Sequence, residues 1–191
     1  FQKFVSGHNI TAMLGHEAQE ARWRGMSGVR ANFPTNDLPV LGLGDPATAA
    51  NNEYQGSTAL ESYFTRVAYS YKNRYSLTAT LRADGSSKFD PTGENQWGYF
   101  PAVGVAWNLS EEAFLENAGW LSNLKLRGGY GEVGNQDVPN YLFGVGLLQS
   151  QSGIGVGFLP DKIANSQLRW ESATQLNAGL DVGFFDSRLN L

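Results

Sequence analysis

Alternation of apolar and polar residues over strand-length stretches is the feature that most constrains how this chain can fold. The clearest case is residues 74–84. Side chains of a β-strand point to opposite faces in turn, so this segment predicts a ribbon with one apolar and one polar face. A soluble sandwich can use such a ribbon, whereas a barrel in a membrane requires it. The apolar face would carry Tyr75, Leu77, Ala79, Leu81 and Ala83, and the polar face Arg74, Ser76, Thr78, Thr80, Arg82 and Asp84.

Six stretches of this kind are each about long enough to cross a bilayer as tilted strands. They cover residues 8–22, 59–72, 74–84, 97–109, 122–132 and 169–184, and a seventh strand begins near the end of the chain. We expect long outer loops at about 23–58, 85–96 and 133–168. The other connections are a tight turn at 72–74, a short helix at 110–117 that Ser110 would cap, and a tight turn at 185–188. Long and short connections therefore alternate, which is typical of antiparallel outer-membrane barrels.

Composition agrees with strands that have one face on lipid and one on water. Charged residues make up 17% of the chain, against about 25% in typical globular proteins. No run of 18 apolar residues exists, which excludes a membrane-spanning helix. A net charge of −4 argues against a nucleic-acid partner, and the absence of Cys excludes thiolate zinc sites and thiol nucleophiles. We expect neither a cofactor nor a metal.

Charged residues on the predicted inner face are one set of candidate binding residues. They could contact a ligand or another part of the protein, but the simpler interpretation is a water-facing wall whose charges pair across strands. Aromatic side chains of the predicted loops are better candidates for stacking on a ligand or for contacting a partner that covers the loops. The inner-face set is Arg66, Arg82, Lys125, Arg127, Glu171 and Asp181, and the loop set is Phe33, Tyr54, Tyr141 and Phe143. Trp97, Tyr99, Trp170 and Phe184 lie near predicted strand ends, where outward-facing aromatic girdles are found.

Two short motifs suggest chemistry that their surroundings do not support. Gly129 to Gly134 fits G-x-G-x-x-G after a strand, but the following residues cannot open a helix well, so a dinucleotide site is not favoured. Asp84-Gly85-Ser86-Ser87 would need a base for a catalytic serine, and the only histidines, His8 and His16, lie on the weakest predicted strand. A turn capped by Asp84 and the serines fits better. We expect no enzyme.

Several short blocks, in order and with matching spacing, carry a family resemblance over roughly residues 62–191. With them the chain resembles the SusC/RagA family of TonB-dependent outer-membrane transporters of Bacteroidetes-type bacteria. The first sixty residues match weakly. The blocks are Leu81 to Phe89, including Asp84, Gly85, Ser86 and Ser87; Trp97 to Pro101, including Phe100; Trp107; Ser110 to Phe114; Leu121 to Arg127; Tyr130 to Gln136, including Gly134 and Asn135; Trp170-Glu171; and Gln175 to Asp181.

The resemblance implies an all-β, antiparallel, up-and-down barrel segment, part of the later half of a barrel of 22 strands, with residues 110–117 as a periplasmic helix. It implies a Gram-negative outer membrane, a SusD-like lipoprotein as lid, and energy from the TonB complex through an N-terminal region. That region and the plug lie outside residues 1–191, so we interpret the chain as part of a longer protein. The predicted function is import of oligosaccharides or peptides. The alternative is a soluble β-sandwich that binds carbohydrate or protein without transport.

Overall fold

The computed structural model describes residues 1–38, 40–116, 118–185 and 189–190 of the chain. These residues divide into two compact units. The first comprises residues 1–18 and 60–191, and the second comprises residues 19–59. Each unit is described by itself below, although β2 and β3 run through both.

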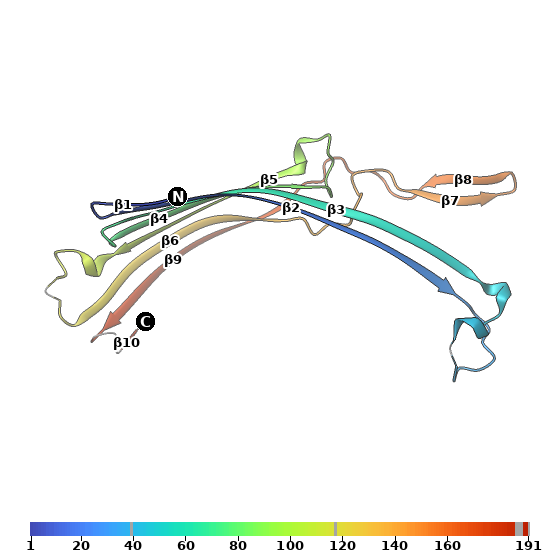
Figure 1. Cartoon of the computed structure of the whole chain (residues 1–191), viewed down its shortest axis with the longest axis horizontal. Coiled ribbons are helices and arrows are strands. Elements are labelled where there is room, and N and C mark those ends of the chain that lie inside the picture. Colours follow the sequence, from blue (N-terminus) through green and yellow to red (C-terminus); the bar gives the residue numbers. More distant parts are fainter. Residues whose placement is uncertain (39, 117, 186–188, 191) are drawn as a thin grey trace. The chain divides into compact units, whose positions relative to one another are not determined.

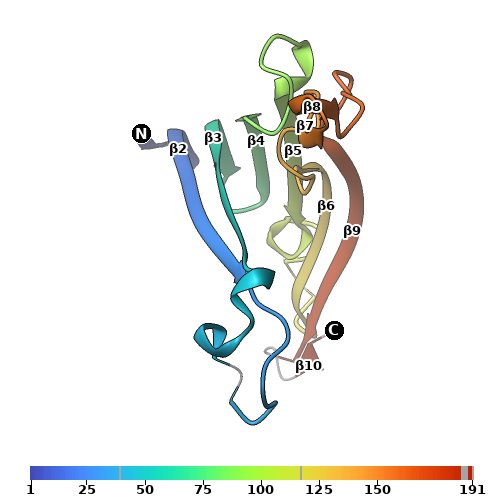
Figure 2. The same cartoon turned by 90° about the vertical axis from the view of Figure 1, so that its right-hand side faces the viewer.

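One antiparallel sheet organises the first unit. Its strand order is β1-β2-β3-β4-β5-β6-β9-β10, so neighbours in space are neighbours in sequence except for the insertion of β7 and β8. Figures 1 and 2 show β4, β5, β6 and β9 as successive ribbons of this sheet. The up-and-down all-β topology is therefore confirmed. The strands are β1 (Gln2–Val5), β2 (His8–Val29), β3 (Ala50–Tyr71), β4 (Tyr75–Ser86), β5 (Trp97–Asn108), β6 (Leu121–Asn135), β7 (Leu147–Ser152), β8 (Gly155–Pro160), β9 (Glu171–Phe184) and β10 (Leu189–Asn190).

The register of the sheet assembles the two predicted faces across its strands. Residues directly opposite each other in antiparallel strands share a face. One outward row runs Tyr71, Tyr75, Trp107, Leu126, Leu180, and a second runs Val67, Ala79, Val103, Tyr130, Leu176. The inner row between them includes Ser70, Ser76, Ala106, Arg127 and Gly179. The alternation read from residues 74–84 thus extends over β3, β4, β5, β6 and β9.

The predicted loop at 23–58 was too long at both ends. β2 continues to Val29 and β3 begins at Ala50, so the loop covers only residues 30–49 and contains the 3₁₀ turns Leu41–Leu43 and Pro46–Thr48. In the second unit, the Trp23 ring covers Gly56 and the Tyr54 ring covers Gly25. Aromatic rings lying over glycine on the neighbouring strand keep a glycine-containing ribbon extended.

The predicted helix at 110–117 was also wrong. The structure has a 3₁₀ turn at Leu109–Glu111 followed by turns, and Asn117 lies outside the described residues. Asn108, not Ser110, precedes the 3₁₀ turn, and its side chain forms no cap there. The Glu112 carboxylate accepts hydrogen bonds from Tyr75 and Trp107 on the neighbouring strands, and these contacts hold the segment in another conformation.

The predicted loop at 133–168 contains a second sheet. β6 runs on to Asn135, and the β7–β8 hairpin pairs Leu147 with Pro160 through to Ser152 with Gly155. At 85–96, β4 extends through Ser86 and a 3₁₀ turn covers Glu94–Gln96. The expected turn after β3 is present at 72–74: Lys72 and Asn73 have positive φ, as the central residues of a type I′ turn require, and the Arg74 N–H donates to the Tyr71 carbonyl oxygen at 2.9 Å. Of the turn expected at 185–188, residues 186–188 lie outside the described residues.

The buried core of the described residues is small. Its buried apolar side chains are Phe89 and Phe100, and its buried polar side chains are Ser62, Asp84 and Ser86. Large apolar residues along the outward rows are exposed instead, including Leu176 at 83%. A soluble β-sandwich buries such rows between two sheets, and among the described residues the second sheet is only the hairpin of β7 and β8. The sandwich alternative therefore does not fit.

Candidate functional site

Residues from four segments contact one another where β4, β5, β6 and β9 reach the long loops. We call this group the loop-base cluster, and its members are Lys88, Phe89, Phe100, Gln136 and Trp170. Phe89 is fully buried, with its ring centroid 5.3 Å from that of Trp170. Phe100 meets the same Trp170 ring at 5.4 Å in an edge-on arrangement. Gly134 leaves room for the Phe100 ring, since a Cβ there would lie 2.0 Å from the Phe100 Cζ.

Polar contacts fasten the loop-base cluster to its neighbours. The Lys88 Nζ donates to the Gln136 carbonyl oxygen at 3.3 Å, and the Trp170 Nε1 donates to the Gln96 carbonyl oxygen at 3.0 Å. The Asn135 amide donates to a Glu171 carboxylate oxygen at 3.1 Å. The β4–β5 loop, the end of β6 and the start of β9 are thereby joined. Trp170 was expected to face outward in an aromatic girdle, and that prediction was wrong, because this packing holds its ring in the cluster.

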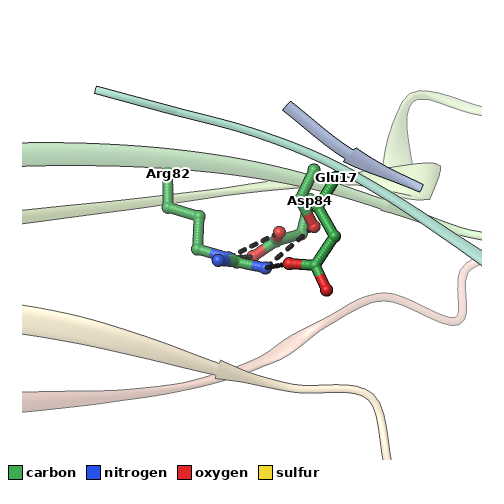
Figure 3. Close-up of polar contacts among 4 residues, drawn as sticks. Glu17, Arg82 and Asp84 are labelled. Atoms are coloured by element: carbon green, nitrogen blue, oxygen red, sulfur yellow. Dashed lines mark hydrogen bonds and ion pairs between the residues drawn. The ribbon is translucent and has the colours of Figure 1, made fainter. Parts of the chain in front are cut away.

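A second group on the inner face, which we call the polar-face cluster, consists of Glu17, Ser62, Phe64, Arg82 and Asp84. The Arg82 Nε contacts both Asp84 carboxylate oxygens at 2.7 and 2.8 Å, and its Nη2 donates to the Ser62 hydroxyl at 2.9 Å. The Glu17 carboxylate lies 3.9 Å from the same Nη2, and Figure 3 shows it near the Asp84 carboxylate at the end of the Arg82 side chain. The guanidinium also lies 5.6 Å from the centroid of the Phe64 ring, a cation–π distance.

The structure changes the interpretation of Asp84. We expected Asp84 and the two serines to cap a turn, but Asp84 lies inside β4, is 6% exposed and pairs with Arg82. Ser86 fits the expectation, because its hydroxyl accepts a hydrogen bond from the Lys88 backbone N–H at 3.2 Å. Burying a charged group is costly unless it is paired and hydrogen-bonded, and Arg82 supplies that partner for Asp84.

Other predicted inner-face residues follow the pairing pattern of a wet wall. Arg127 and Asp181 form an ion pair at 3.2 Å, and Lys125 lies opposite Asp181 in the register. Arg66 lies opposite Thr80 on the same face. The G-x-G-x-x-G stretch at 129–134 lies within the continuous strand β6, so no helix follows it as a dinucleotide site would need.

Aromatic residues gather at both ends of the outward face. Near the loops, Tyr63 lies 4.6 Å from His16 and 6.0 Å from Trp97, measured between ring centroids. At the turn end, Tyr75 stacks on Trp107 at 6.1 Å and Trp120 on Phe184 at 5.8 Å. Trp97 and Trp107 are ten residues apart on β5, which at about 3.3 Å per residue and a tilt of about 40° spans a height of about 25 Å. That is the height of the apolar band of a membrane barrel.

At the turn end, Arg74, Tyr75, Trp107 and Glu112 form what we call the corner cluster. Glu112 accepts hydrogen bonds from the Tyr75 hydroxyl, from the Trp107 Nε1 at 3.0 Å and from the Arg74 Nη1 at 3.3 Å. The bond from Tyr75, followed by that from Trp107, holds the pKa of the Glu112 carboxyl below its usual value. The cluster ties the β5–β6 connection to the β3–β4 turn without a helix.

The loop aromatics do not come together in one site. In the second unit, Tyr54 is 57% exposed on β3, while Phe33 is half-buried against Gly44 in the loop. In the first unit, Tyr141 is 52% exposed at a positive φ, and Phe143 is half-buried. Their predicted role in ligand binding stays a prediction.

Sequence reasoning did not single out several of the interacting residues. Lys88 and Phe89 entered only as parts of a family block, Trp170 entered in a family block and as an expected girdle residue, and Glu17, Ser62 and Phe64 were not considered as site residues. A period-two pattern assigns a side chain to a face, but the partners on that face depend on the register. Within the described ranges, no group of three His, Asp or Glu lies close enough to hold a metal ion, and no helix there is long and apolar enough to span a membrane.

Comparison with known proteins is consistent with this geometry. Residues 4–191 match the family described as TonB dependent receptor-like, beta-barrel. The chain is 40% identical to TonB-dependent receptor SusC of Bacteroides thetaiotaomicron over 98% of its own length and 19% of that protein. It is 33% identical to TonB-dependent receptor P3 of Formosa agariphila over 100% of its length and 19% of that relative.

A solved structure gives the same result for the fold. The structure of the RagAB peptide transporter superposes with a TM-score of 0.85 at 26% identity, over 100% of this chain and 21% of that one. The chain therefore spans about a fifth of the length of each of these proteins. The curated relatives are named as receptors, not as enzymes.

Proposed function

The chain belongs to the TonB-dependent receptor-like β-barrel family, and from this premise we propose that it forms part of the wall and outer loops of an outer-membrane importer for oligosaccharides or peptides. The single observation that carries the proposal is the two-faced sheet. Its outward face is apolar between two sets of aromatic residues, and its inner face carries paired charges. Lipid on one side and a watery lumen on the other explain both faces.

The partners in this proposal follow from the rest of the barrel. A SusD-like lipoprotein would cover the outer loops, and the TonB complex would act through an N-terminal region outside this chain. The polar-face cluster would lie in the lumen wall. It carries two carboxylates around one guanidinium, so a basic side chain of a plug domain would be the complementary contact there.

The two ends of β5 offer a matched test of membrane orientation. Glu94 precedes β5 in the loop-side connection and Glu116 follows β5 in the turn-side connection, and both are exposed. The 191 residues contain no Cys, so Glu94→Cys or Glu116→Cys places one thiol within this chain, in a full-length receptor otherwise freed of cysteine. A membrane-impermeant maleimide should label Glu94→Cys on intact cells, and Glu116→Cys only after the outer membrane is permeabilised. Equal labelling of both on intact cells would contradict the proposal.

Cargo is tested separately with the receptor gene deleted and restored. Growth on single oligosaccharides and on peptide mixtures, compared between the two strains, identifies the cargo class. Tyr141→Ala and Tyr54→Ala in the restored gene then test the loop aromatics. If stacking on sugar rings matters, these variants should slow growth on the oligosaccharide without lowering the amount of receptor in the membrane.

A further inference from the structure

A groove of about 620 Å³ lies on the outward face near the corner cluster. Tyr75, Val105, Trp107 and Leu126 line it with side chains that share this face in the register. Ser76, Ala106 and Arg127 also line it, but their side chains belong to the inner face, so they contribute backbone. The groove is therefore walled by apolar side chains and floored by the sheet itself.

Gly128 accounts for the hollow. It lies opposite Val105 and Ala178 in the register, between the rows that carry Leu126 and Tyr130. A Cβ at Gly128 would meet Val105 and Asn177 no closer than 3.7 Å, so the backbone does not need glycine for lack of room. Leaving this position without a side chain keeps a channel open between two rows of large side chains.

Basic residues lie at the turn end of the groove. The row Tyr71, Tyr75, Trp107 borders it, and the Lys72 Nζ lies 5.3 Å from the centroid of the Tyr71 ring. Arg74 follows in the same turn, with its guanidinium on Glu112. Stacked aromatic side chains with Lys and Arg beside them are found at the level of lipid headgroups.

The proposed function makes this face a lipid-facing one, and the inference rests on it. We propose that the groove holds one acyl chain of a phospholipid whose phosphate lies beside Lys72. In a bilayer, apolar surface alone provides no driving force, because the surrounding chains are equally apolar. An acyl chain lying in the groove gains dispersion contacts on three sides, and the ammonium group of Lys72 attracts the lipid phosphate. An ordered lipid at this position would also fill the hollow that Gly128 leaves on the outward face.

The test uses the full-length receptor in detergent, titrated with dioleoyl phosphatidylglycerol and followed by native mass spectrometry. Gly128→Leu fills the groove, and Ala79→Leu adds the same side chain elsewhere on the outward face. We expect Gly128→Leu to weaken the tightest lipid adduct by about tenfold or more, a factor that corresponds to about 1.4 kcal/mol. Ala79→Leu should match the wild-type receptor, and Lys72→Gln should weaken the same adduct.

Each alternative outcome is distinct. Equal lipid binding by wild type, Gly128→Leu and Ala79→Leu would overturn the proposal, as would an equal loss in the two leucine variants. A receptor pair that dissociates in Gly128→Leu without a change in lipid adducts would assign the groove to a second copy of the chain and overturn the lipid assignment. A receptor that stays soluble without detergent would instead refute the membrane wall itself, so the two proposals fail separately.

Discussion

An arginine at Val103 should test directly which face of the sheet contacts lipid. Val103 is 43% exposed in the outward row and lies four residues from Trp107 and six from Trp97 on β5. With a rise of about 3.3 Å per residue and a tilt of about 40°, it lies about 10 Å from the turn-end aromatic residues and about 15 Å from the others. That depth is close to the middle of the apolar band, where a charge on the lipid face costs about 2–4 kcal/mol.

The control is the next residue. Gly104 points to the inner face, and a Cβ there meets nothing within 4 Å, so Gly104→Arg should reach water in the lumen at little cost. Ser76→Arg, also on the inner face, is a second control, in case an arginine at position 104 clashes with its neighbours. The assay is the thermal midpoint at which the full-length receptor loses its folded, heat-modifiable gel mobility, with the amount in outer membranes as a second measure. Similar losses in Val103→Arg and both inner-face variants would refute the assignment of the faces.

Three further changes test the clusters in the same assay. Gly134→Ala should cost about 1–3 kcal/mol by displacing the Phe100 ring, which its Cβ would meet at 2.0 Å, whereas Gly104→Ala should be tolerated; a stable Gly134→Ala variant would contradict the packing. Glu112→Gln should make the thermal midpoint fall less than that of the wild type as the pH is lowered. The folded-state pKa of Glu112 is lowered, so its contribution is present above its usual pKa of 4.5 and is lost as the pH falls through the folded-state pKa; parallel profiles for wild type and variant from about pH 7 to about pH 3 would argue against this. Asp84→Asn should cost about 1–3 kcal/mol, because a nearly buried partner of a guanidinium loses its charge, and an unchanged midpoint would show that the pair contributes nothing.

The faces of the sheet could be predicted from sequence because they depend on the residue period alone. Odd and even positions of a strand point to opposite faces, so this parity separates Tyr75 and Leu77 from Ser76 and Thr78 before any partner strand is known. Antiparallel pairing then carried the same parity into β5 and β6. Those elements also matched family blocks, so fold class and family were both within reach.

Strand ends were less predictable because they depend on partners. Gly25 and Gly56 looked like loop residues, yet the Tyr54 and Trp23 rings on the neighbouring strand cover them and β2 and β3 continue past both. The residues after Leu109 have acids suited to a helix start, but Glu112 bonds Tyr75 and Trp107 instead. Trp170 has the parity of an outward residue, and contacts with Phe89 and Phe100 override it.

The loop-base cluster explains why the family could be recognised from a chain whose candidate ligand-binding residues carry no motif. Blocks far apart in sequence, such as 81–89, 130–136 and 170–171, meet there and are constrained by one another: Phe89 is fully buried, and Lys88 reaches the backbone of Gln136. The exposed aromatics Tyr54 and Tyr141 lie outside it. A rigid base of this kind lets loop tips change without disturbing the wall, so exchanging residues 137–168 for those of a relative should transfer cargo preference while leaving the thermal midpoint of the barrel close to that of the wild type.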